Sequence, residues 1–174
     1  MKKTLKRRRK ENKTNYLKRL KLLKSKMPRL VFRKTNKYVI SQYVTSKQAK
    51  DKVEIGLSSK QLIKYGWPKE FQGSLKSIPA SYLLGFLIGK KIIKEKKETP
   101  IIDFGMIRVL HKTKIFAFLK GLIDAGVEIK YKKNVFPNDE QIMGKNLKKD
   151  FSENFNEIKS KIASGDVLMN GKKE

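Results

Sequence analysis

Two segments of the sequence combine residue types that occur in enzyme active sites, but neither has the full pattern. Residues 85–90 (Gly-Phe-Leu-Ile-Gly-Lys) resemble a phosphate-binding glycine-rich loop, yet they are one residue short, lack the following Ser or Thr and fall inside a helical pattern. His111 could act as a general base, but no nucleophile or orienting carboxylate lies near it in the sequence. We therefore interpret residues 85–90 as part of a helix and His111 as a loop residue on the surface.

Carboxylates could also do chemistry, as ligands of the metal ions in nucleases of the ribonuclease H type. Those enzymes carry the first carboxylate on the first strand, whereas the first expected strand here, residues 29–33, has no acid. Asp103 ends a later expected strand without a second carboxylate to join it, so we interpret it as a hydrogen-bonding or loop-capping residue. The chain has no cysteine and one histidine, which excludes disulfide scaffolds, zinc fingers and cysteine nucleophiles. The sequence predicts no catalytic residue, no metal site and no cofactor.

Basic residues dominate the sequence instead. Lys and Arg number 43 against 16 Asp and Glu, which gives a formal net charge of +27 at pH 7. A charge of this size opposes compaction, and a polyanionic partner is the natural reason for a chain to carry it. Nucleic acid is the first candidate partner and an anionic membrane surface the second. Because 39% of the residues are hydrophobic, the chain also has enough apolar material for a folded core.

The basic residues form three clusters. One lies in the N-terminal arm, one on an expected hairpin tip, and one in the loop before an expected helix. Consecutive arginines in the arm stand out in a lysine-rich chain, because guanidinium groups bind phosphates bidentately and stack on bases. Three clusters on a compact scaffold suit a folded RNA better than a regular duplex, since no element resembles a groove-reading helix. The clusters are Arg7, Arg8 and Arg9; Arg33, Lys34, Asn36 and Lys37; and Arg108, Lys112 and Lys114.

Hydrophobic periodicity and turn residues predict the elements that position these clusters. Residues 2–10 are expected to be a basic arm that is disordered when free. A short amphipathic helix follows from Thr14 to Pro28, with Leu17, Leu20 and Leu23 on one stripe. Strands are expected over residues 29–33, 38–44, 52–58, 100–104 and 127–131, and helices over residues 77–94, 114–125 and 152–164.

Three details of these elements are open to a direct structural check. Asn36 is suited to the left-handed conformation of a tight turn between the first two strands. In the third strand the alternation places Val53, Ile55 and Leu57 on one face. Small residues recur every four positions in the long helix, at Ser81, Gly85 and Gly89, which would let a sheet or RNA approach its backbone closely.

Trp67 lies between Gly66 and Pro68, which mark a rigid turn. Its ring could stack on a nucleobase, but the turn favours packing on the core. The longest uncharged stretch, residues 77–89, has thirteen residues, fewer than the about 20 of a membrane-spanning helix. No apolar stretch of signal-peptide length follows the basic N-terminus. We therefore expect a compartment that contains nucleic acid, and no membrane.

The element order predicts an α/β fold with a mixed five-stranded sheet, an antiparallel meander followed by parallel βα units, as in the ribonuclease H-like topology. Helices are expected to flank the sheet, with a basic N-terminal arm and a C-terminal helix. We divide the chain into the arm and short helix (1–27), an α/β RNA-binding core (28–148) and the C-terminal helix and tail (149–174).

Several segments together resemble a known family, the 5S-rRNA-binding large-subunit ribosomal proteins of the universal L-eighteen family in their archaeal and eukaryotic form. The similarity covers roughly residues 5–165. It rests, in chain order, on residues 28–31 (Pro-Arg-Leu-Val), 33–37 (Arg-Lys-Thr-Asn-Lys), 64–67 (Lys-Tyr-Gly-Trp), 79–83 (Pro-Ala-Ser-Tyr-Leu), 103–105 (Asp-Phe-Gly), 116–117 (Phe-Ala), 120–121 (Lys-Gly), 123–126 (Ile-Asp-Ala-Gly) and 135–137 (Val-Phe-Pro). The long C-terminal extension of eukaryotic members is absent, which favours the archaeal branch.

The resemblance implies a non-catalytic constituent of the large ribosomal subunit in the cytoplasm. Such a protein binds 5S rRNA and helps anchor it in the central protuberance, beside large-subunit rRNA and neighbouring ribosomal proteins, and has no small-molecule substrate. The family carries a proline, a threonine and a glycine where this chain has Val109, Leu110 and Lys112. The expected rRNA contacts are Lys6, Arg7, Arg8, Arg9, Tyr16, Arg29, Arg33, Lys34, Thr35, Asn36, Lys37, Arg108, Lys112 and Lys114.

Two other functions stay open on the residues alone. One is an architectural nucleic-acid binder outside the ribosome, and the other is a divergent metal nuclease. The RNA that copurifies with the native protein separates the first from a ribosomal protein, since a ribosomal protein of this family would bring a discrete 5S-sized species. Metal-dependent cleavage of an RNA–DNA hybrid would indicate the second.

Overall fold

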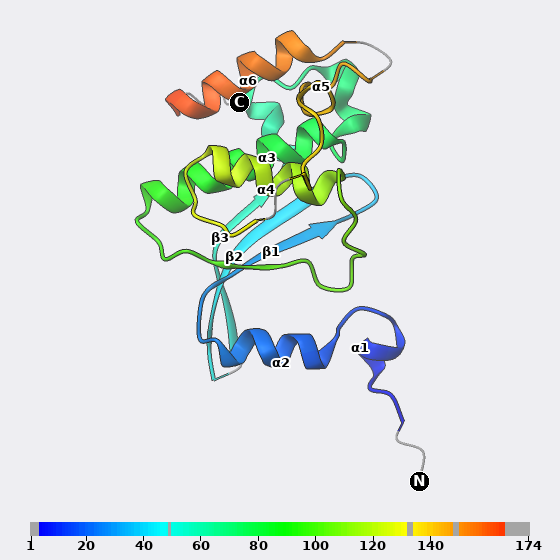
Figure 1. The fold of residues 1–174 in the computed structure, drawn as a ribbon, viewed down its shortest axis with the longest axis vertical. Helices are drawn as coiled ribbons and strands as arrows, with labels where there is room; N and C mark the ends of the chain where they lie inside the picture. The colour runs from blue at the N-terminus through cyan, green and yellow to red at the C-terminus, as the bar shows by residue number, and fades with distance from the viewer. Residues whose placement is uncertain (1–3, 49, 132–133, 148–149, 166–174) are drawn as a thin grey trace, which may run out of the picture.

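A computed structural model describes residues 4–48, 50–131, 134–147 and 150–165 (Figure 1). It confirms an α/β fold with a mixed sheet and flanking helices. The α-helices are α1 (Arg7–Lys10), α2 (Tyr16–Lys24), α3 (Ile78–Lys94), α4 (Lys114–Asp124), α5 (Asp139–Met143) and α6 (Ser152–Ser164), with 3-10 helices η1 (Ser59–Tyr65) and η2 (Lys69–Ser74). The strands are β1 (Arg29–Lys34), β2 (Val39–Lys47), β3 (Lys50–Ser58) and β4 (Ile101–Asp103). Helices α5, η1 and η2 were not expected from the sequence.

The strands of the described residues form one sheet in the order β3-β2-β1-β4. β1 pairs antiparallel with β2, and β2 with β3, whereas β4 runs parallel to β1. The expected fifth strand, residues 127–131, is not formed. Val127 instead bonds through its N–H to the carbonyl of Leu122 at the end of α4, and Tyr131 packs its ring on Phe136, 5.1 Å between centroids. These contacts direct the segment away from pairing with β4.

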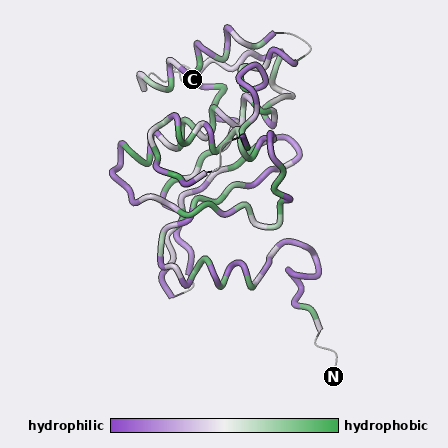
Figure 2. The backbone as a smooth tube through the Cα atoms, in the orientation of Figure 1, coloured by the Kyte–Doolittle hydropathy of each residue, from purple (hydrophilic) through white to green (hydrophobic). Residues whose placement is uncertain are grey.

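Helices α3, α4, α5 and α6 form two further layers on one face of the sheet (Figure 1). α3 and α4 cover the sheet, and α5 and α6 lie on the other side of α3. α3 is buried almost all round because it has neighbours on both sides, which explains a helix without a polar face. As expected, Phe155, Ile158 and Ile162 of α6 are buried in the same core. Figure 2 shows the apolar backbone concentrated in these layers and a mostly hydrophilic N-terminal segment.

Glycines let α3 and α4 pack with their backbones in direct contact. A Cβ added at Gly85 would lie 2.2 Å from the carbonyl oxygen of Phe118, and one at Gly121 would lie 2.2 Å from that of Tyr82. No side chain fits at either distance. The repeat of small residues in α3 therefore serves the approach of α4, and the expectation that it admits a sheet or RNA was wrong.

A β-bulge changes the faces of β3. The register shifts between Tyr43, which lies opposite Ile55, and Val44, which lies opposite Val53. Neighbouring residues of β2 point to opposite faces, so Val53 lies on the face opposite to Ile55 and Leu57. It is 48% exposed, whereas Ile55 is buried. The expectation of three apolar residues on one face was wrong because an extra residue interrupts the alternation.

The β1–β2 turn is closed by a hydroxyl. Thr35 Oγ1 donates to the carbonyl of Tyr38 at 2.8 Å and accepts from the N–H of Tyr38 at 2.9 Å. The residues with a positive φ do not include Asn36, so the left-handed turn expected there was wrong. Lys34, Thr35, Asn36 and Lys37 are exposed around this turn.

α2 lies against the face of the sheet that α3 and α4 leave open (Figure 1). Asn15 caps it, because its side chain accepts from the N–H of Lys18. None of its residues is buried, and Leu17 and Leu20 are 75% and 52% exposed. α2 turns Lys18 and Arg19 inward, where Lys18 bonds to the Gly105 carbonyl after β4 and Arg19 to Asp51 of β3, and leaves these leucines exposed. Ahead of α2, Arg7–Lys10 form a helical turn where an arm without regular structure was expected.

Candidate nucleic-acid interface

The residues that could have built an active site have structural roles. Asp103 is 6% exposed, and its carboxylate accepts from the Gly105 N–H at 2.7 Å and from Arg33 Nη2 at 3.1 Å. This geometry confirms its interpretation as a hydrogen-bonding, loop-capping residue. Within the described parts of the chain, no three His, Asp or Glu side chains gather as a metal site requires, and no helix is long and apolar enough to cross a membrane.

The structure also gives the positions of the glycine-rich segment 85–90, of His111 and of Trp67. Residues 85–90 lie within α3, with Gly85 and Gly89 buried. His111 is exposed in a loop, and the edge of its ring contacts Phe116. Trp67 is buried, its Nε1 donates to the Phe71 carbonyl at 2.9 Å, and its ring packs on Phe151. The interpretation of Trp67 as a core residue is confirmed.

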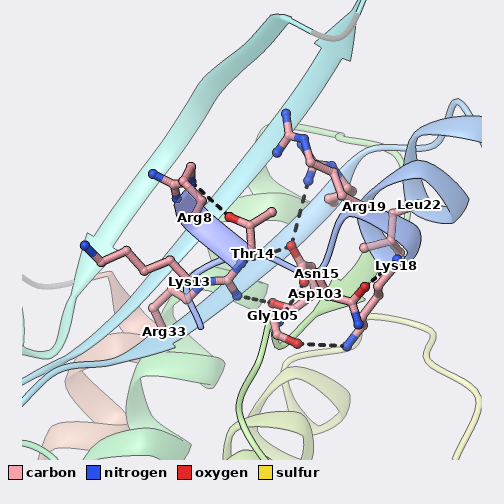
Figure 3. A pocket seen from close by; sticks show the side chains of 11 residues that line it. Arg8, Lys13, Thr14, Asn15, Lys18, Arg19, Leu22, Arg33, Asp103 and Gly105 are labelled. Carbon is pink, nitrogen blue, oxygen red and sulfur yellow. Dashed lines mark hydrogen bonds and ion pairs between the residues drawn. The ribbon is translucent and has the colours of Figure 1, made fainter. Parts of the chain in front are cut away.

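A cationic pocket lies between the N-terminal segment and the open face of the sheet (Figure 3). Its volume is about 120 Å³. The charged residues that line it come from the arm, from α2, from β1 and from the end of β4. Among its described lining residues the cations outnumber the single carboxylate six to one. They are Arg8, Lys13, Lys18, Arg19, Arg29 and Arg33, with Asp103 as the carboxylate. We call it the arm pocket.

Asp51 attaches α2 to the sheet below the arm pocket. It accepts from Arg29 of β1 at 2.7 Å and from Arg19 of α2 at 2.9 Å, and Ser46 donates to it as well. Partial burial acts to raise the pKa of Asp51, but the hydrogen bonds from Ser46, Arg19 and Arg29 outweigh it and hold the pKa below its ordinary value. The carboxylate therefore stays ionised and couples the helix to the sheet.

The structure gives Arg29 and Arg33 internal partners. Arg29 is 3% exposed and is bonded to Asp51, with Asp103 3.8 Å away. Arg33 was expected on the hairpin tip with Lys34 and Lys37, but it is on the opposite face of β1. There it donates to the Asp103 carbonyl at 2.8 Å, while its side chain remains 40% exposed. Alternation along β1 separates Arg33 from the tip.

The arm residues lie beside the arm pocket. Arg8 donates to Thr14 Oγ1 at 3.0 Å, and Arg9 reaches the Met106 sulfur in the loop after β4 at 3.6 Å. Lys6 Nζ lies 4.9 Å from the centre of the Tyr16 ring. Arg7 points outward with an 84% exposed side chain. The predicted arm contacts are thus brought together on one side of the molecule.

A second pocket connects the hairpin with the loop before α4, and we call it the loop pocket. Its volume is about 330 Å³. Lys34 of the hairpin and the predicted loop cations lie on one cavity here, although about 75 residues separate them in sequence. Burial, with the nearby charges of Lys34 and Lys76, holds the pKa of Lys114 below its ordinary value. The described residues lining it are Phe32, Lys34, Ile78, Ile107, Arg108, Leu110, Lys112, Thr113, Lys114 and Ile115.

Sequence reasoning missed four cations of these surfaces: Lys13, Lys18, Arg19 and Lys76. The acid at Asp51 beside the basic strand position Arg29 was a usable signal for Arg19, because a carboxylate on the open face of the sheet attracts a cation of the helix above it. Lys76 precedes the cap of α3, and nothing in its local sequence links it to Lys114.

The sequence model of one protein family, described as ribosomal large subunit proteins 60S L5 and 50S L18, matches residues 2–101 of this chain. The chain belongs to this family. Proteins named large ribosomal subunit protein uL18 are similar over 141 residues, 81% of this chain. The one from Korarchaeum cryptofilum is 40% identical with 70% of its length covered, and the one from Methanospirillum hungatei is 36% identical with 78% covered. A third, from Methanoregula boonei, is 36% identical with 79% covered.

Membership of the L5/L18 family confirms the resemblance, and these three relatives are archaeal, as was expected of this chain. Proteins of the L5/L18 family are structural constituents of the large ribosomal subunit, and they are not enzymes. The same membership locates the chain in the ribosome, in the cytoplasm. Membership of this family therefore favours a ribosomal protein over the two alternatives, a metal nuclease and a nucleic-acid binder outside the ribosome.

Proposed function

We propose that the chain binds 5S rRNA and helps anchor it in the central protuberance of the large ribosomal subunit. Large-subunit rRNA and neighbouring ribosomal proteins of the protuberance complete its surroundings. The observation that carries the proposal is the arm pocket, where six cations from three parts of the chain lie together and outnumber the carboxylates that pair with them, which are Glu11, Asp51 and Asp103. Phosphate groups are the ligand that such a surface attracts most strongly.

The arm pocket suits a folded RNA because its cations are held in place. Arg19 is bonded to Asp51 and Lys18 to the Gly105 carbonyl at 3.3 Å, so α2 presents its remaining donors from a fixed position. Arg7, Arg8 and Arg9 extend this surface along the arm. A rigid array of donors recognises the shape of an RNA backbone, whereas a flexible basic tail contributes only charge.

Within this proposal the predicted contacts divide into two roles. Lys6, Arg7, Arg8, Arg9, Tyr16, Lys34, Thr35, Asn36, Lys37, Arg108, Lys112 and Lys114 contact rRNA. Arg29 acts by position, since its buried guanidinium donates to Asp51 and so fixes the carboxylate that holds α2. Arg33 does both, because it orients the loop after β4 and keeps part of its side chain exposed.

The proposed architecture is ribonuclease H-like without its catalytic carboxylates. The order β3-β2-β1-β4, with a parallel β1–β4 pair after an antiparallel meander, supports it. The position of the first catalytic carboxylate falls on β1, whose residues Arg29–Lys34 contain no acid.

Competitive binding of the intact protein tests the proposal. The purified chain is titrated with a 5S rRNA transcript of its own species in the presence of an unrelated RNA of equal length. We expect a clear preference for 5S rRNA, a discrete 5S-sized RNA in the native protein, and a larger loss for Arg8→Gln than for Lys96→Gln. Equal affinity for both RNAs would instead indicate an architectural nucleic-acid binder.

A further inference from the structure

The loop pocket combines an apolar floor with a cationic rim. Its floor is apolar, with Ile78 of α3, Ile107 of the loop after β4 and Ile115 of α4 around it. Its rim carries Lys34 and Lys114, with the further cations of the loop. A patch that binds only phosphates needs no apolar floor, and a socket for an apolar side chain needs no excess of cations.

Within the part of the chain that the structure describes, the cations of the rim have no counterions. Among the described residues, none of Lys34, Arg108, Lys112 and Lys114 forms an ion pair. No Asp or Glu occurs in the described lining of the pocket. The cationic groups repel one another, so an anionic group bound between them relieves an unfavourable charge.

The size of the pocket sets the size of the occupant. A volume of about 330 Å³ is at the lower end of the about 300–1,000 Å³ typical of sites for small ligands. It has room for one flat ring system and excludes a duplex. Leu110 stands at the entrance with 46% of its surface exposed, where it would cover one face of an inserted ring.

We propose that the loop pocket receives one unpaired nucleotide of rRNA, with the base against the isoleucines and Leu110 and the phosphate between Lys34 and Lys114. This inference rests on the proposed rRNA binding and adds to it a reader of an unstacked base. An unstacked base in a loop or bulge offers both the apolar face and the anionic backbone that the pocket matches.

Two neighbouring residues allow a matched test. Leu110 and Val109 are 46% and 45% exposed, but only Leu110 lines the pocket. The intact protein and its Leu110→Ser and Val109→Ser variants are titrated with an adenosine heptamer and with the same heptamer carrying abasic sites. Leu110→Ser should weaken heptamer binding about five- to tenfold, while Val109→Ser changes it less than twofold. The abasic heptamer should bind both variants equally.

Salt dependence separates the base from the phosphate. Leu110→Ser should leave the slope of log affinity against log salt unchanged, whereas Lys34→Gln should make it shallower by about 0.7. Equal effects of Leu110→Ser and Val109→Ser, or an equal loss on the abasic heptamer, would overturn the inference. So would an effect of Leu110→Ser that appears only with neighbouring ribosomal proteins, which would assign the pocket to a protein side chain. A wild-type preference for 5S rRNA, measured alongside, would leave the proposed function standing in each of these cases.

Discussion

Arg29 and Asp51 form the contact that joins the two sides of the candidate interface. Arg29 has a side chain that is 3% exposed, and its Nη2 donates to Asp51 Oδ1 at 2.7 Å. Arg19 of α2 donates to the other carboxylate oxygen, Oδ2, at 2.9 Å. One carboxylate thus neutralises a buried cation of the sheet and holds a cationic helix against it. Without it, α2 and the sheet would repel each other.

Replacing Asp51 by Asn should therefore destabilise the protein and release α2. We expect a loss of about 2 kcal/mol, below the about 3–5 kcal/mol of a fully buried pair, because the Asp51 side chain keeps 31% exposure. Arg19→Gln removes only the exposed half of the contact and should cost about 0.5 kcal/mol. Urea unfolding measures both free energies. Equal losses would mean that Arg29 finds sufficient compensation from Asp103.

The pH dependence of stability should report the same carboxylate. The pKa of Asp51 is lowered in the folded protein, so its contribution is present above the unfolded-state pKa of about 3.9 and is lost as pH falls through the lower folded pKa. The difference in unfolding free energy between wild type and Asp51→Asn should stay constant from about pH 7 to 5 and shrink below about pH 4. Urea midpoints at each pH give the difference. Parallel curves down to pH 3 would show that the ionised form is not what matters.

The contact of α3 with α4 should not tolerate a methyl group. Gly85→Ala brings a Cβ to 2.2 Å from a backbone oxygen that belongs to another helix and cannot move alone. The cost should exceed about 3 kcal/mol, the upper range for overpacking. Gly73→Ala is the control, because no described residue other than its chain neighbours lies within 4 Å of its added Cβ. Thermal unfolding of the two variants should separate them clearly, and similar melting temperatures would refute the direct packing of the backbones.

The backbone of Lys112 has a φ of +56°, in the left-handed region that favours glycine. A non-glycine residue in this region destabilises the folded protein by about 1–2 kcal/mol. Glycine removes this strain, but it also raises the conformational entropy of the unfolded chain, which offsets part of the gain. Lys112→Gly should therefore stabilise the protein by about 0.5 kcal/mol while it weakens RNA binding. Lys112→Gln, which keeps the strain and removes the charge, should weaken binding equally without stabilising. Denaturant unfolding that ranks Lys112→Gly below Lys112→Gln would contradict this account.

The sequence was informative wherever local chemistry decides the structure. Ser77 before Pro79 marked the start of α3, whose capping bond from the Ala80 N–H is present, and the spacing of Phe155 and Ile158 marked the buried face of α6. Asp103 could be interpreted because the residues around it excluded catalysis. These features depend on a few neighbouring residues, so a single sequence contains them.

Features that depend on distant residues could not be predicted. The bulge opposite Tyr43 changes the face of Val53, and no local pattern announces it. Arg29 was expected to contact RNA, because its partner Asp51 lies on another strand and local sequence does not reveal the pair. The fifth strand was expected from its β-branched residues, but the contact of Tyr131 with Phe136 decides otherwise. In each case a tertiary contact outweighs the local propensity.

The last prediction asks whether the arm binds by position or by charge alone. Each phosphate contact releases condensed counterions, so the salt slope counts contacts at about 0.7–0.9 each, whatever the net charge of the protein. Replacing Arg7, Arg8 and Arg9 by Gln removes three bases without touching the core, because α1 has no buried residue. The slope for 5S rRNA should then fall by about 2. Replacing Lys91, Lys94 and Lys96 by Gln, at and just after the end of α3, removes the same charge from residues that do not line the arm pocket and should leave the slope unchanged.

Both triple variants lose three positive charges and so have the same net charge as each other. If only net charge mattered, the two variants would bind 5S rRNA with the same affinity. A positioned site predicts that only the arm variant loses contacts, while it still prefers 5S rRNA to an unrelated RNA through the hairpin and loop cations. Suppose that the arm variant keeps its slope but loses this preference. The arm would then recognise RNA shape without phosphate contacts, and the division of labour between arm and core would be the reverse of the one proposed.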